Sequence, residues 1–150
     1  MQDMTPPSWL IYPKSTARLV LKLANESPVL TVFGNPQGLA SLTGIFIWLQ
    51  SFSDHGALSV SALSFVNPQG ALALSVVLTL DEAADQGRVV RLDRDRQFEW
   101  RIGDEQLLEV AVQLHRVATS PDYVDYFEPR VCLESDARVR FEATASVNEP

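Results

Sequence analysis

Few residues able to carry out chemistry occur in this chain, and they are widely spaced. The sequence holds two histidines, His55 and His115, and one cysteine, Cys132. A metal site on a helix would need a second ligand about one turn away, and His115 has none. A single cysteine excludes an intramolecular disulfide and a cysteine metal cluster. We interpret His55 as a turn residue, His115 as a helix-boundary residue and Cys132 as a small buried residue, and we predict no catalytic residue, metal or cofactor.

The stretch 34–38, Gly-Asn-Pro-Gln-Gly, stands before an apolar helix in the way that phosphate-binding loops do. It contains no basic residue and no Gly-Lys-Ser/Thr. The acidic stretch 81–85 also lacks the spacing of a calcium loop. We therefore interpret 34–38 as a helix start, with Asn35 as N-cap and Pro36 in the first helical position.

The segment 120–130 combines tyrosines with carboxylates, which is typical of a protein-binding surface. Interface centres favour aromatic residues, and an acidic rim attracts a basic partner. The predicted partner-binding residues are Asp122, Tyr123, Asp125, Tyr126 and Glu128, with Trp48 and Phe52 on the first helix. The alternative is an edge strand whose tyrosines pack inward and whose acids are solvated.

Charge and apolar content restrict the partners of this 150-residue chain. Its formal net charge is −7, which disfavours nucleic acid and anionic membrane surfaces. No apolar run approaches the ~20 residues of a membrane-spanning helix, and the first residues do not have the pattern of a secretory signal. We expect a cytoplasmic protein with a protein partner, and the acidity fits a partner that is basic.

Alternating and helical patterns predict an α+β fold in a single domain, 1–150. We expect an extended leader over 1–16, a first ββαββ half over 17–80, a second ββαββ half over 86–145 and a tail over 146–150. Short connections favour antiparallel sheets, with the two helices packed on one side. The predicted strands are 17–24, 29–33, 57–65, 71–80, 88–92, 97–102, 123–127, 131–133 and 137–145, and the predicted helices are 36–52 and 105–118.

The two halves align without a gap when 17–51 is placed on 86–120, a shift of 69 residues. Asn35 then coincides with Asp104, which is predicted to cap the second helix. We predict an internal duplication. The alternative is that two unrelated units look alike because the same residue types begin and end their strands and helices. The first helix is apolar almost all round, so it must be covered on more than one side or meet a partner.

The stretch 33–42 and the apolar helix after it resemble bacterial immunity proteins of polymorphic toxin systems. Gly34, Gly38, Leu39 and Leu42 match the Gly-x-x-x-Gly-Leu-x-x-Leu pattern of the immunity protein 32 family over about residues 29–49. The resemblance implies a small acidic binder that neutralises a toxin by occluding it, with a basic toxin domain as partner. The alternatives are a homodimeric secretion-effector chaperone, and a small-ligand-binding or enzyme domain with an unrecognised site.

Overall fold

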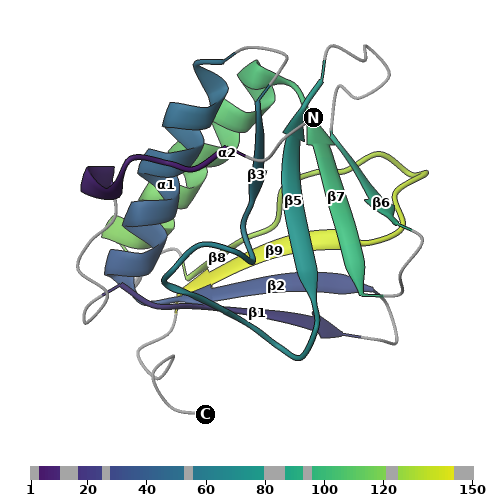
Figure 1. The fold of residues 1–150 in the computed structure, drawn as a ribbon, viewed down its shortest axis with the longest axis horizontal. Helices are drawn as coiled ribbons and strands as arrows, with labels where there is room; N and C mark the ends of the chain where they lie inside the picture. Colours follow the sequence, from purple (N-terminus) through teal and green to yellow (C-terminus); the bar gives the residue numbers. More distant parts are fainter. Residues whose placement is uncertain are drawn as a thin grey trace.

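The computed structural model describes residues 4–10, 17–24, 28–52, 56–79, 87–92, 96–120 and 125–143 (Figure 1). Its elements in chain order are η1 (Ser8–Leu10), β1 (Leu19–Ala24), β2 (Val29–Gly34), α1 (Pro36–Gln50), β3 (Ala57–Ser59), β4 (Val66–Pro68), β5 (Ala73–Leu78), β6 (Arg88–Arg91), β7 (Gln97–Ile102), α2 (Asp104–Thr119), β8 (Tyr126–Phe127) and β9 (Arg138–Ala143).

The strands form two mixed sheets, with the orders β4-β1-β2-β9-β8 and β3-β5-β7-β6. The predicted α+β class is therefore confirmed. The four neighbouring-strand pairs β1/β2, β3/β5, β6/β7 and β8/β9 are antiparallel. The sheets are mixed rather than antiparallel throughout, because β2 runs parallel to β9, β5 to β7 and β1 to β4. The β2/β9 and β5/β7 pairs join strands from different halves of the chain, where no short connection dictates direction.

Both halves contribute strands to both sheets, so the halves interlock: β4, β1 and β2 share one sheet with β9 and β8, and β3 and β5 share the other with β7 and β6. β2 lies beside β9 over six residue pairs, from Val29↔Arg138 to Gly34↔Ala143. β7 lies beside β5 in the same way, from Gln97↔Ala73 to Ile102↔Leu78. The two halves thus share one topology and one register. Their origin by duplication stays a prediction.

The structural equivalence of the halves is a shift of 68 residues, one fewer than the predicted 69. With 68, the buried residues Leu39, Leu42 and Phe46 of α1 coincide with Leu107, Val110 and Leu114 of α2, which are also buried. With 69, Leu39 would coincide with Leu108, which is 40% exposed. A slip of one residue rotates each helical position by about 100°, which moves a buried residue onto an exposed one, so burial decides the alignment.

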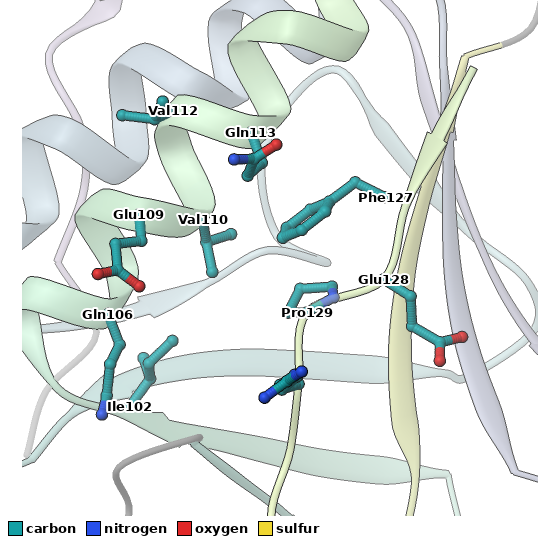
Figure 2. Close-up of a pocket in the computed structure, with 10 residues that line it drawn as sticks. Ile102, Gln106, Glu109, Val110, Val112, Gln113, Phe127, Glu128 and Pro129 are labelled. Carbon is teal, nitrogen blue, oxygen red and sulfur yellow. The ribbon is translucent and has the colours of Figure 1, made fainter. Parts of the chain in front are cut away.

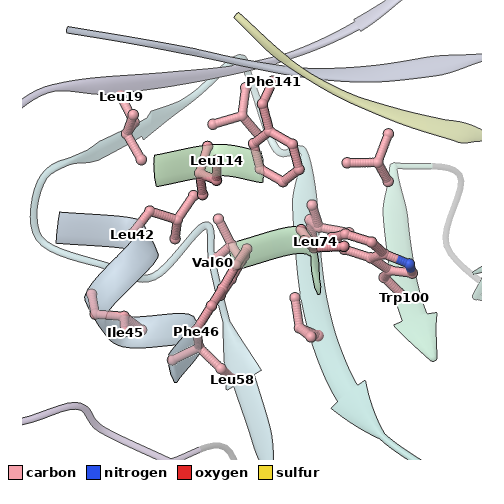
Figure 3. Packing of buried hydrophobic residues seen from close by; sticks show 14 of the residues in the cluster. Leu19, Leu42, Ile45, Phe46, Leu58, Val60, Leu74, Trp100, Leu114 and Phe141 are labelled. Carbon is pink, nitrogen blue, oxygen red and sulfur yellow. The ribbon is translucent and has the colours of Figure 1, made fainter. Parts of the chain in front are cut away.

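One apolar core fills the space between the helix pair and the two sheets (Figure 3). α1 and α2 lie against each other on one side of the molecule (Figure 1). At the centre Phe46 of α1, Trp100 of β7 and Phe141 of β9 meet with ring centroids 6.2 to 6.4 Å apart. Each aromatic ring comes from a different layer, so this cluster joins the helices to both sheets.

Two predicted strands differ from the structure. The strand predicted over 57–65 ends at Ser59, and a turn follows in which the Leu63 amide donates to the Val60 carbonyl. The residues 66–68, predicted to lead into a turn, form β4 beside β1. Residues 131–133 are not a strand. Instead the Cys132 amide donates to the Gly87 carbonyl next to β6.

The two helix starts differ in how they are capped. Asn35 is the N-cap of α1, as predicted, and its Oδ1 accepts from the Gly38 amide at 2.8 Å and the Arg18 amide at 3.0 Å. The prediction for α2 is wrong by one residue, because Gly103 is the N-cap and Asp104 is the first helical residue. There the Gln106 Oε1 accepts from the Gly103 amide at 3.0 Å.

The chain's own N-terminal segment, Met4–Leu10, covers an apolar side of α1 (Figure 1). The Met4 amide donates to the Ala57 carbonyl of β3 at 2.7 Å. Leu10 Cδ2 lies 3.6 Å from the position that a Cβ on Gly44 would take. The core, α2 and this segment together cover most of the apolar surface of α1, although Ile47 remains 45% exposed.

Candidate protein-binding site

An open groove of about 590 Å³ lies between α2 and the chain that leaves β8 (Figure 2). Five of its lining residues are apolar and five are polar. The apolar lining residues are Ile102, Val110, Val112, Phe127 and Pro129, and the polar ones are Gln106, Glu109, Gln113, Glu128 and Arg130.

Regular structure holds most of these side chains in place. Gln106, Val110 and Gln113 follow one another at helical spacing, so they line one flank of α2. Leu107, Ala111 and Leu114 occupy the buried stripe. Opposite α2, Phe127 is fixed by the pairing of β8 with β9, and Figure 2 shows its ring directed toward α2. The groove is therefore bordered by two elements that the core holds rigidly.

Two apolar side chains of α2 that lie outside its buried stripe are exposed to solvent. Val112, which lines the groove, is 54% exposed, and Leu108, one turn earlier, is 40% exposed. Both residues stand outside the buried stripe of α2. Exposed apolar side chains next to a concavity with a polar border are typical of a site that another molecule covers.

The charges around the groove are mainly negative. Glu105 and Glu109 are exposed on α2, and neither forms an ion pair with a residue that the structure describes. Glu128 is bound to Arg138, with Oε2 and Nη1 3.3 Å apart, and Figure 2 shows it directed away from α2. Arg130 is the basic lining residue. Of the two helix glutamates Glu109 lines the groove and Glu105 lies one turn earlier, while Arg116 of the same helix donates to the lining residue Gln113 at 3.4 Å.

The structure separates the residues that the sequence predicted to act together. Glu128 lines the groove, but Tyr126 points to the opposite face of β8, where the Arg140 guanidinium lies 4.0 Å from its ring centroid. Asp125 is exposed next to it. Asp122 and Tyr123 lie outside the described residues, so the prediction for them stays untested.

Trp48 and Phe52 lie at the far end of α1 and do not line the groove. Their rings meet edge to face, with centroids 5.2 Å apart, and both are half-buried. Sequence reasoning missed the α2 side of the groove. The available signal was the pair Leu108 and Val112, four residues apart and off the main apolar stripe.

The other candidate chemical residues form no site in the described chain. His115 is exposed on α2, and His55 lies outside the described residues. Cys132 was predicted to be buried, but it is half-buried, with Sγ 3.7 Å from the Ser135 hydroxyl. The described residues contain no group of three His, Cys, Asp or Glu side chains placed to hold a metal.

The pKa of the exposed Glu134 carboxyl is lowered from its ordinary value. The larger cause is a hydrogen bond from its own backbone, and the next is a hydrogen bond from Cys132.

The glycines that carry the resemblance to immunity proteins have a packing role. A Cβ on Gly34 would collide with the Leu19 side chain, and a Cβ on Gly38 would collide with the Arg18 carbonyl oxygen. Both glycines therefore allow α1 to start close against β1. Leu39 and Leu42 are fully buried.

No described helix has the length and apolar character needed to cross a bilayer. Comparison of the chain with protein-family models, curated proteins and solved structures found no match.

Proposed function

We propose that this protein binds another protein through the groove beside α2 and thereby neutralises a bacterial toxin in the cytoplasm. The observation that carries the proposal is the combination of a groove with apolar lining residues, the 54% exposed Val112 among them, and Glu109, which lines the groove and forms no ion pair with a described residue. The toxin-neutralising role follows from the resemblance at Gly34, Gly38, Leu39 and Leu42.

The groove suits a protein partner on energetic grounds. Covering the apolar lining, Val112 included, removes apolar surface from water and gains about 25 cal/mol for each Å². The two glutamates add electrostatic attraction to a basic surface, which raises the association rate and favours basic partners over acidic ones. Inhibition by such a complex is steric, so it needs no catalytic group in this chain.

A small-molecule ligand is the second candidate function. The groove volume of about 590 Å³ lies within the range of ligand sites, about 300–1,000 Å³. A ligand-binding protein would show a rise in melting temperature with a metabolite, whereas the proposed immunity protein would show it with a toxin domain.

The decisive experiment co-purifies the protein with the toxin domains encoded next to its gene. We expect a one-to-one complex by size-exclusion chromatography and protection of cells that express the toxin. Val112→Asp should weaken the complex at least about tenfold in calorimetry. The matched control is Leu133→Asp, because Leu133 is fully exposed and does not line the groove. A complex that Val112→Asp leaves unchanged would contradict the role of the groove.

A further inference from the structure

The groove beside α2 has a structural equivalent in the first half of the chain. With the shift of 68 residues, Val112 of α2 corresponds to Gly44 of α1. The sheet register extends the equivalence to the edge strands. Ala57 of β3 pairs with Val77, and Tyr126 of β8 pairs with Glu142, in corresponding positions of the two sheets.

In the first half the N-terminal segment Met4–Leu10 contacts two positions of this place, Ala57 on the edge strand and Gly44 on the helix. Met4 bonds to the edge of β3 at Ala57, Pro6 is buried, and Leu10 lies against α1 at Gly44. The segment thus runs from the edge strand to the helix, and Figure 1 shows it crossing α1 to reach η1. In the first half, therefore, an extended apolar segment that contains prolines packs between the helix and the edge strand.

In the second half the same place is open in the described chain. Val112 is 54% exposed, although its equivalent Gly44 is covered by Leu10. β8 is the last strand of its sheet, as β3 is of the other. The groove therefore presents an edge strand, an apolar floor and a helix face, which are the surfaces that hold Met4–Leu10 in the first half.

The two places differ most in charge. The positions of α2 that correspond to Gln37 and Ser41 of α1 carry Glu105 and Glu109. Neither glutamate forms an ion pair with a described residue. An occupant of the second place is therefore favoured over the neutral segment Met4–Leu10 when it adds basic side chains.

From this equivalence we infer the nature of the partner segment, on the basis of the proposed function. The groove beside α2 takes an extended, proline-containing apolar segment with flanking lysine or arginine. Its main chain lies along the edge of β8, an apolar side chain covers Val112, and its basic residues meet Glu105 and Glu109. This is strand-edge and groove recognition combined, in which the main chain gives affinity and side chains give selectivity.

A synthetic peptide tests the inference on the full-length protein. The probe is Met-Thr-Pro-Pro-Ser-Trp-Leu, the sequence of Met4–Leu10, with two lysines added at its C-terminus. We expect chemical-shift changes in labelled protein at Glu109, Val112 and Phe127. The same peptide ending in two glutamates should bind at least about tenfold more weakly, and added salt should weaken binding of the lysine peptide.

Two variants separate the groove from the first-half site. Glu109→Lys should reduce affinity for the lysine peptide and improve it for the glutamate peptide, whereas Ser64→Lys, at an exposed position outside the groove, should change neither. Shifts confined to Gly44 and its surroundings, equal affinity for both peptides, or no binding would overturn the inference. A toxin complex that depends on Val112 while the peptide fails to bind would overturn only the inferred segment and leave the proposed function standing.

Discussion

At the level of single residues, the two helix starts look alike in sequence but are stabilised by different atoms. Asn35 accepts two backbone hydrogen bonds, from Gly38 and Arg18, and so ties α1 to the start of β1. Asp104 is already inside α2, and its Oδ1 accepts a hydrogen bond from the neighbouring Glu105 amide rather than from N2 or N3 as an N-cap would. The Asn35 side chain therefore stabilises the start of α1, whereas the Asp104 side chain does not cap α2.

Asn35→Ala should lower the free energy of unfolding by about 1–2 kcal/mol, because two backbone amides lose their acceptor. Asp104→Ala should cost only about 0.5 kcal/mol, since it removes a favourable charge from the first turn but no N-cap. Urea denaturation followed by circular dichroism measures both. Equal losses for the two variants would show that the cap of α1 is not Asn35.

Trp100 and Trp48 differ in burial, so their substitution should differ in its effect on stability. Trp100 is fully buried between Phe46 and Phe141, whereas Trp48 is half-buried beside Phe52. Trp100→Ala should cost about 3–5 kcal/mol by leaving a large cavity. Trp48→Ala should cost roughly 1–2 kcal/mol, in proportion to the smaller apolar area that it buries. The denaturant midpoints of the two variants show which one loses more stability. A larger loss for Trp48→Ala than for Trp100→Ala would contradict the central position of Trp100 in the core.

At the level of elements, α1 depends on a segment that is remote from it in sequence. Truncation of residues 1–10 removes Leu10 from Gly44 and the Met4 bond from β3. The truncated protein should melt at a lower temperature and bind an apolar dye, because a helix that is apolar on all sides then faces water. The matched control is Trp9→Ala, which leaves the segment in place and alters a side chain that is 79% exposed. Dye binding equal to that of the intact protein would contradict the covering role.

The elements themselves could largely be predicted from the sequence, because alternation and capping are local. Strand partners could not, since β2 meets β9 and β5 meets β7 across long separations that no local pattern records. The shift of 69 residues came from matching the caps Asn35 and Asp104. Helix starts carry an uncertainty of one or two residues, and one residue is enough to exchange the faces of a strand.

The candidate site was only partly predictable for a related reason. Glu128 was found because acidic and aromatic residues cluster near it in sequence. Glu109, Val112 and Gln113 lie on a helix whose surface pattern alone does not say what faces it. Tyr126 was assigned to the same surface, yet strand alternation turns it to the other face of β8.

At the level of the whole molecule, the two halves should stabilise each other, because each sheet contains strands from both. β9 and β8 of the second half extend the sheet of β4, β1 and β2, and β3 and β5 of the first half belong to the sheet that contains β7 and β6. Neither sheet can therefore be formed by one half of the chain. The aromatic cluster has the same property, because Phe46 comes from the first half while Trp100 and Phe141 come from the second.

This arrangement predicts that a chain cut between the halves stays assembled. When the chain is cut at a protease site inserted between β5 and β6, the two fragments should co-elute with an unchanged circular dichroism spectrum. Separation requires exposing most of the core, so it should occur only at denaturant concentrations near the unfolding midpoint. A matched cut within 11–16 should release the short segment Met4–Leu10 at lower denaturant, because few contacts hold it. Fragments that part in buffer alone would mean that each half folds by itself, which the shared sheets forbid.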